Sequence, residues 1–148
     1  MITLTDQAFD PGTLMSDFCR GRTETGAVAS FVGLARAEGG AAAVLELDAY
    51  PGFTEAQIAL HVATAQGRFE LQDVRIVHRI GAIVPGEPIV FVATAASHRR
   101  AAFEACDFLM DYLKSRAPFW KKETGPDGAR WIEPRPQDLS DLARWETP

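Results

Sequence analysis

The chain has 148 residues, of which 47% are hydrophobic and 24% charged, and this suits one globular domain and excludes a disordered chain. Its net charge of −5 argues against a general nucleic-acid binder, because attraction to phosphates supplies most non-specific affinity. The two cysteines, Cys19 and Cys106, are too few for a disulfide framework or a CxxC metal site. Residues 1–10 carry no secretory signal, and no apolar run reaches the roughly 18–20 residues that span a bilayer. We expect a single cytoplasmic domain over residues 1–148 that binds neither nucleic acid nor membrane.

Short apolar strands alternate with helices along the chain. Asp10 followed by Pro11 is typical of a helix start, and the residue before Pro118 marks a helix end because it avoids the helical region. Residues 89–95 are continuously apolar, which predicts a strand in the middle of a sheet. In chain order we expect a strand at 2–5, a helix at 10–21, strands at 27–34 and 44–50, a helix at 54–71 capped by Thr54, strands at 74–80 and 89–95, a helix at 102–113, and strands at 119–123 and 129–133.

The last two strands flank the sequence GPDG at residues 125–128, which is a hairpin signal. Residues 38–40 form a Gly-containing break, and residues 134–148 are polar with scattered apolar side chains, so we expect a loosely docked tail. The mixture of strands and helices, without repeats or a linker, predicts one α+β domain.

Positive charge is concentrated in one segment of this acidic chain. Residues 97–122 contain six Lys or Arg and three acidic residues, so that segment carries +3 and the remainder −8. All three lysines, Lys114, Lys121 and Lys122, lie within it. This pattern predicts a focused cationic site for a small anionic ligand.

The first candidate for such a site is the start of the helix after residues 89–95, where His98, Arg99 and Arg100 follow one another. Helix N-termini attract anions, and a histidine there can act as an acid or base near neutral pH. The structural alternative is a solvated first turn, in which Arg100 pairs with Glu104 one turn later.

The second candidate is the pair Lys114 and Lys121. Lys114 ends a helix, where a cation is also favourable as a cap, and Lys121 lies in an expected strand with Lys122 on the opposite face. A partly desolvated lysine has a lowered pKa and can serve as base, acid or nucleophile. The alternative is two ordinary surface lysines.

Arg36 follows an apolar strand and could clamp a carboxylate or phosphate through two parallel hydrogen bonds, or could be a surface arginine. His61 and His78 have no partner at a chemically useful spacing, so we expect structural roles for both. The motifs of zinc proteases, dinucleotide and P-loop sites, serine hydrolases and EF-hands are absent.

Two long motifs make the sequence similar to the large, catalytic subunit of molybdopterin synthase. They are HRRAAFEA at residues 98–105 and MDYLKSRAPFWKKE at residues 110–123, continued by RWIE at 130–133. Weaker matches are residues 26–36, 47–50 and 78–81. The resemblance extends over roughly residues 2–145, which is most of the chain.

The resemblance implies an α/β hammerhead fold with an additional antiparallel β subdomain. It implies a homodimer in which each copy binds a small ubiquitin-like sulfur-carrier subunit, giving a heterotetramer. The C-terminal Gly-Gly thiocarboxylate of the carrier would enter a pocket of this chain. Two carriers in turn would supply sulfur to cyclic pyranopterin monophosphate, through a hemisulfurated intermediate, to give the dithiolene of molybdopterin. No metal or other cofactor is implied for this step.

The resemblance also implies roles for particular residues. Lys114 would be the acid/base or covalent group at the carbon that receives sulfur, and Lys121 would neutralise the thiocarboxylate or developing negative charge. Arg135 matches an arginine that the neighbouring subunit contributes. The implied substrate-binding set is Leu34, Ala35, Arg36, His98, Arg99, Lys122, Glu123 and Arg135.

Two other functions are compatible with the same residues. One is a non-catalytic adapter that binds the tail of a ubiquitin-like partner, and the other is an enzyme acting on another small phosphate ligand. The presence of both Lys114 and Lys121 favours a sulfurtransferase over an adapter.

Overall fold

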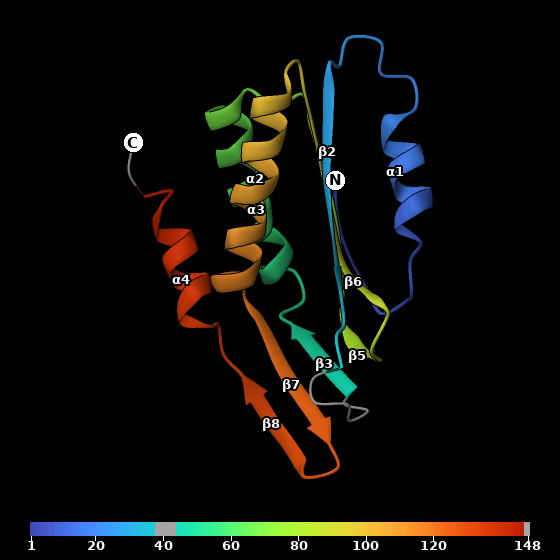
Figure 1. Ribbon diagram of the computed structural model, residues 1–148, viewed down its shortest axis with the longest axis vertical. Coiled ribbons are helices and arrows are strands. Elements are labelled where there is room, and N and C mark those ends of the chain that lie inside the picture. Colours follow the sequence, from blue (N-terminus) through green and yellow to red (C-terminus); the bar gives the residue numbers. More distant parts are fainter. Residues whose placement is uncertain (38–43, 147–148) are drawn as a thin grey trace.

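The computed structural model describes residues 1–37 and 44–146, so the break expected at residues 38–40 lies outside the described residues. Within them the chain forms two four-stranded sheets and four helices (Figure 1). The elements are β1 (Ile2–Thr5), α1 (Pro11–Cys19), β2 (Ala27–Leu34), β3 (Val44–Ala49), α2 (Phe53–Phe69), β4 (Asp73–Arg79), β5 (Gly81–Ile83), β6 (Pro88–Ala96), α3 (Arg99–Ser115), β7 (Phe119–Gly125), β8 (Gly128–Ile132) and α4 (Pro136–Ala143). The expected α+β architecture is confirmed. None of the described helices has the length and apolar character to span a membrane.

The first sheet has the strand order β1-β4-β6-β2, with β1 parallel to β4 and the other pairs antiparallel. Helix α1 lies on one face, and α2 and α3 lie on the other (Figure 1). Successive side chains of β6 alternate between the two cores: Val92 packs in the core with α2 and α3, whereas Phe91 packs against α1. The continuous apolar run of β6 therefore reflects burial on both faces, as its predicted central position requires.

The second sheet is entirely antiparallel and has the order β5-β3-β7-β8. It extends beyond the ends of α2 and α3, at the lower end of the molecule in Figure 1. Strands β7 and β8 form the expected hairpin, in which Gly125 pairs with Gly128 and Lys121 pairs with Ile132. The chain enters β7 directly from α3, which places the strand's first residues next to the C-terminal end of that helix.

Two helix starts and one short strand differ from the sequence-based expectations. Helix α3 begins at Arg99, three residues earlier than expected, because His98 is the N-cap although its side chain makes no capping hydrogen bond. Helix α2 begins at Phe53 behind Gly52 at φ 80°, and not behind Thr54. The Thr54 hydroxyl is fully buried and instead donates to the Pro118 carbonyl, at 2.9 Å. The three-residue strand β5 was not expected from the sequence.

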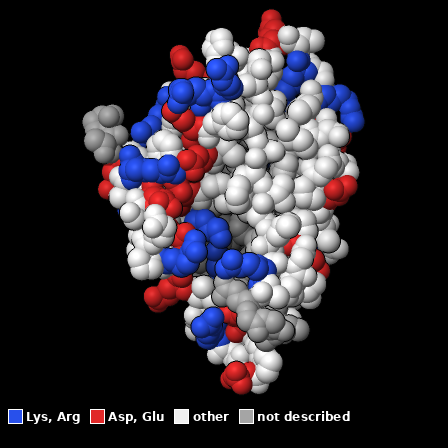
Figure 2. Space-filling model, in the orientation of Figure 1, with Lys and Arg blue, Asp and Glu red and all other residues white. Residues whose placement is uncertain are grey.

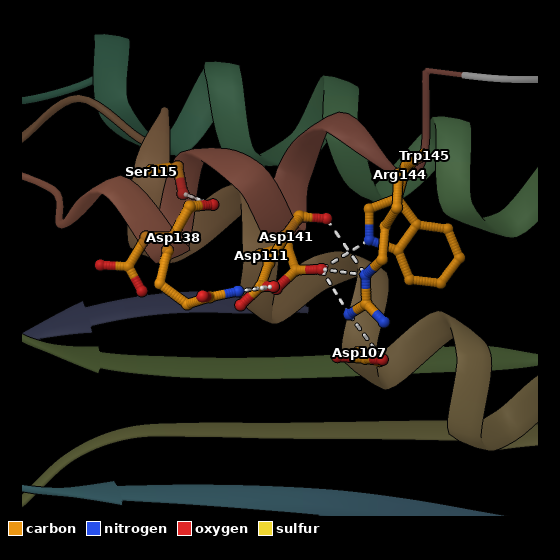
Figure 3. Close-up of polar contacts among 8 residues, drawn as sticks. Asp107, Asp111, Ser115, Asp138, Asp141, Arg144 and Trp145 are labelled. Atoms are coloured by element: carbon orange, nitrogen blue, oxygen red, sulfur yellow. Dashed lines mark hydrogen bonds and ion pairs between the residues drawn. The ribbon is translucent and has the colours of Figure 1, made fainter.

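The expectation of a loosely docked tail is wrong for the part of the tail that the structure describes. Residues 136–143 form α4, which packs along α3. Figure 3 shows how it is held: Arg144 Nη2 lies 2.8 Å from a carboxylate oxygen of Asp107 and 2.7 Å from one of Asp111. Trp145 Nε1 donates to the same Asp111 oxygen at 2.6 Å. These contacts order a helix that would be too short to be stable alone.

Two glycines provide a matched test of the packing between the start of β2 and the end of β6. A Cβ on Gly26 would collide with the backbone oxygen of Ser97, whereas a Cβ on the exposed, helical Gly67 meets nothing. We expect Gly26→Ala to lower the free energy of unfolding by roughly 1–3 kcal/mol through overpacking. Gly67→Ala should raise it by roughly 0.5–1 kcal/mol through helix propensity. Urea denaturation of both variants measures these changes, and equal effects would contradict the expectation.

Candidate active site

A cavity of about 940 Å³ opens where the first sheet, the C-terminal end of α3 and the β7–β8 hairpin meet. Its size is in the range of small-molecule sites. Five Lys or Arg side chains and three Asp or Glu side chains line it, so it is positively charged on a protein of net charge −5. Figure 2 shows Lys and Arg gathered around this hollow in the lower half of the molecule. The charge and the volume suit a small anion.

Lys114 and Lys121 reach this cavity from different elements. Lys114 lies in the last turn of α3 and is exposed, and it also borders a smaller groove between β2 and α3. Lys121 is half-buried and lies in β7. Burial and the charge of Lys114 lower the pKa of Lys121 to about 8, while the Asp138 carboxylate acts in the opposite direction. Lys121 can therefore exchange a proton near neutral pH.

His78, which the sequence analysis set aside, lies in the cavity wall on β4. The residue is 4% exposed, and its ring stacks on that of Phe119, with the ring centroids 4.1 Å apart. Nδ1 lies 2.8 Å from the Arg79 carbonyl oxygen, and because a carbonyl can only accept, Nδ1 carries the proton. Burial, followed by the charges of Lys121 and Lys114, lowers the pKa of His78 to about 4, although the Arg79 hydrogen bond opposes this. The imidazole is therefore neutral at physiological pH.

Two acidic side chains of the wall are paired with arginines. Glu123 lies on the same face of β7 as Lys121 and accepts from Arg130 of β8, at 3.0 Å from Nη2 and 3.2 Å from Nε. Asp138, at the start of α4, accepts from the backbone N–H of Arg135 at 3.0 Å, from its Nε at 3.4 Å and from its Nη2 at 3.3 Å. The cavity is therefore a network of paired charges around two lysines.

The structure brings seven of the residues predicted for the site together around this one cavity. They are Leu34, Ala35, Arg36, Lys114, Lys121, Glu123 and Arg135. The Ala35 N–H already donates to the Glu87 carbonyl at 2.9 Å, and the Ala35 carbonyl accepts from the Gly86 N–H at 2.7 Å. The Ala35 N–H is thus used within the protein, and a ligand would meet the methyl group or the carbonyl. Arg135 lines the cavity of its own chain, although the resemblance implied that the neighbouring subunit contributes it.

Three residues predicted for the site lie outside the cavity lining. His98 and Arg99 begin α3, and the 16 residues from His98 to Lys114 correspond to roughly 24 Å of helix. Beside them Arg100 forms an exposed ion pair with Glu104 at 3.6 Å, which is the pair expected for a solvated first turn. Lys122 follows Lys121 on β7 and belongs to the opposite face of the sheet.

Asp138 was also not singled out from the sequence. Pro136 at the first helical position and an acidic residue two positions later are a helix-start signal, so α4 itself could have been found. Nothing local indicates that this turn borders the two lysines, because that depends on how α4 packs against α3.

Similarity to known proteins shows the family to which this chain belongs. The family described as MoaE protein matches residues 4–116. The molybdopterin synthase catalytic subunit of Caulobacter vibrioides is 69% identical over 146 residues, covering 99% of this chain and 97% of the relative. The chain belongs to the MoaE family. It is accordingly an enzyme of molybdenum cofactor biosynthesis, as the resemblance in the sequence predicted.

Solved MoaE structures have the same fold. The molybdopterin biosynthesis MoaE protein from Burkholderia ambifaria superposes with a TM-score of 0.85 at 44% identity, covering 100% of this chain and 99% of that one. A complex of subunits 1 and 2 of the molybdopterin-converting factor from Helicobacter pylori superposes with a TM-score of 0.77 at 19% identity, covering 90% and 91% of the two chains. The second likeness shows the fold alone. The MoaE match ends at Arg116, whereas the Caulobacter relative extends the similarity through the hairpin that carries Lys121.

Proposed function

We propose that the cavity binds cyclic pyranopterin monophosphate beside the C-terminal thiocarboxylate of a small ubiquitin-like carrier, and that sulfur passes between them there. The observation that carries the proposal is the meeting of Lys114 and Lys121 in one positively charged cavity. Both ligands are anions, so the cavity's charge favours them at the same place. The neutral His78 ring and the apolar lining restrict water, which strengthens the remaining electrostatic interactions.

In this proposal the two lysines have different tasks. Lys114 gives or takes the proton, or forms the covalent bond, at the pterin carbon that receives sulfur. Lys121, in its charged form, neutralises the thiocarboxylate and the charge that develops as the carbon–sulfur bond of the carrier breaks. Each transfer leaves the carrier tail as a carboxylate, with oxygen from water. Arg36 and Arg135 hold the substrate phosphate and pterin.

The carrier subunit is the partner that this reaction requires. The Helicobacter pylori structure is a complex of two different subunits, and the fold it shares with this chain supports a comparable pairing here. We also propose that residues 1–148 act as one domain in the cytoplasm. Both cysteines are free, which suits a reducing compartment.

A second copy of the chain would complete the site. Strand β2 is at the edge of its sheet and exposes Phe31, Val32 and Leu34, with exposed fractions of 40%, 37% and 57%. Phe103 of α3 is 67% exposed and lines the smaller groove between β2 and α3. An apolar edge strand invites pairing unless it is covered. In this proposal a homodimer covers this face. His98 and Arg99, which lie outside the cavity lining of their own chain, serve the cavity of the other copy, and two carriers complete a heterotetramer.

Reconstitution tests the reaction directly. The purified chain is mixed with thiocarboxylated carrier and cyclic pyranopterin monophosphate, and molybdopterin is detected as its fluorescent oxidised derivative. Product from the wild type is the expected result. A folded chain that binds the carrier and yields no product would overturn the enzymatic proposal and leave the adapter function. Competition by common nucleotides would instead point to another phosphate ligand.

Because each proposed active site contains residues of both copies, two variants that are inactive alone should complement each other. We expect co-expression of Lys114→Ala chains with His98→Ala/Arg99→Ala chains to restore roughly a quarter of wild-type activity. Random pairing makes half of the dimers mixed, and each mixed dimer has one intact site. Co-expression of Lys114→Ala with Lys121→Ala should restore none, because these two side chains line the same cavity of one chain. Equal recovery in both mixtures would contradict the sharing of sites.

A further inference from the structure

Asp138 is the acidic side chain of the cavity wall that comes from α4. Its side chain is 13% exposed, and it shares the cavity with Lys114 and Lys121. It accepts the three hydrogen bonds from Arg135 described above, one from the backbone N–H and two from the guanidinium. Arg135 is itself 72% exposed and lines the same cavity, so these hydrogen bonds restrict the orientation of its guanidinium.

The position of Asp138 is fixed from both ends of α4. At the start, the Ser115 hydroxyl donates to the Asp138 backbone carbonyl at 3.0 Å, which ties this turn to the residue directly after Lys114 (Figure 3). At the far end, Arg144 and Trp145 bind Asp111 of α3. A negative charge is therefore built into the wall of a site that must accept anions. By itself such a charge weakens anion binding, which indicates that Asp138 has another role in this site.

We propose that Asp138 is a positioning residue of the sulfur transfer: it aims the Arg135 guanidinium and keeps positive charge on Lys121. This inference rests on the proposed function. Arg135 and Asp138 form an ion pair, and the Asp138 carboxylate lines the same cavity as the two lysines, whose mutual repulsion favours a neutral Lys121. The negative charge of Asp138 thus favours the protonated, positively charged form of Lys121, which is the form that the proposed reaction uses.

The electrostatics around Asp138 agree with this role. Hydrogen bonds from Arg135 and the charges of Arg135 and Lys114 outweigh burial and hold the pKa of Asp138 below its ordinary value. Asp138 is thus ionised at neutral pH. The charge of Asp138 raises the pKa of Lys121, against burial and Lys114, which lower it. The other ionisable side chains around the cavity are Arg36, His78, Glu123, Arg130, Glu133 and Arg135.

Asp138→Asn tests the proposal with Asp141→Asn as the matched control. Asparagine keeps an oxygen that can cap α4, so the helix is retained while the charge is lost. Asp141 lies one turn further along the same helix, where it accepts from Gln137 at 2.7 Å, and it is outside the cavity lining. Thermal denaturation of both variants checks that α4 remains folded.

Direct titration of Lys121 provides the first measurement and does not depend on activity. The chain contains three lysines, so labelling lysine with ¹³C at Cε gives three signals that single Lys→Arg variants assign. In Asp138→Asn the Lys121 midpoint should move to lower pH, and in Asp141→Asn it should not move. An unchanged Lys121 titration in Asp138→Asn overturns the proposal.

Kinetics with the pterin substrate and thiocarboxylated carrier provide the second measurement. Asp138→Asn should lower kcat/KM roughly 10- to 100-fold, with part of the loss in KM for the pterin because Arg135 is no longer aimed. Wild-type kcat/KM in Asp138→Asn, or an equal loss in Asp141→Asn, overturns the positioning role. Failure of the wild type to form molybdopterin would reject the proposed function instead, while the Lys121 titration would still decide whether Asp138 controls that charge.

Discussion

Replacing Lys114 with alanine is expected to reduce the rate of molybdopterin formation by roughly 10²–10⁴-fold, the range that a positioned acid or base contributes. Lys114 is exposed at the end of α3, so its removal leaves the core intact. The loss should therefore appear in single-turnover product formation, without a change in thermal stability. Because the proposed role is at the reacting carbon, we expect the loss mainly in kcat.

Arg116→Ala is the matched control for Lys114→Ala. It removes one positive charge two residues later at the same helix end, where Arg116 forms an exposed ion pair with Glu146 at 3.1 Å. Arg116 is outside the cavity lining, so we expect wild-type turnover. A Lys114→Ala enzyme that kept more than about a tenth of wild-type turnover would show that Lys114 is not the acid, base or covalent group.

The activity of the wild type should fall as pH rises through about 8. Burial and the neighbouring Lys114 lower the pKa of Lys121 to about 8, so its positive charge is largely present at pH 7 and largely lost at pH 9. The proposed role requires the charged form, so kcat/KM for the free enzyme should follow that loss. The measurement is kcat/KM for the pterin between roughly pH 6 and pH 10, a range that brackets this titration.

The variant Lys121→Arg distinguishes a role that needs the positive charge of Lys121 from a role that needs Lys121 to lose its proton. Arginine stays charged throughout this range, so the decline through pH 8 should disappear, although a lower plateau is expected because the guanidinium differs in shape from the ammonium. A neutral lysine acting as a nucleophile predicts the reverse, a rise in kcat/KM through pH 8 and no activity in Lys121→Arg. That result would require the two lysines to exchange roles.

Much of the fold could be predicted because its signals are local. The strand at residues 27–34 and the hairpin after residue 119 have the expected positions, since period-two patterns and turn residues act over a few positions. Helix α4 was missed although Pro136 and the acidic Asp138 are a helix-start signal, because other features of the segment do not indicate a stable helix. Arg135 is not a preferred N-cap type, and the stability of α4 depends on the distant Asp107 and Asp111.

The candidate site was predicted unevenly for the same reason. Lys114 and Lys121 could be singled out because all lysines of an arginine-rich chain fall in one short segment. His78 looked like any core histidine, because its contact with the cavity depends on the stacking of Phe119 against β4. Asp138 contributed only to a helix-start signal, and nothing in the sequence indicated that it borders the two lysines.

By itself, the sequence determined the family, most of the strands and helices, and the chemical groups available for an anionic ligand. The tertiary structure decided which of these groups meet. It brought Arg36, Lys114, Lys121 and Asp138 to one cavity from separate elements and placed His98 at the opposite end of α3. The physical reason is range: backbone propensities and capping act within a few residues, whereas burial, charge coupling and a lowered lysine pKa arise only when packing brings distant segments into contact.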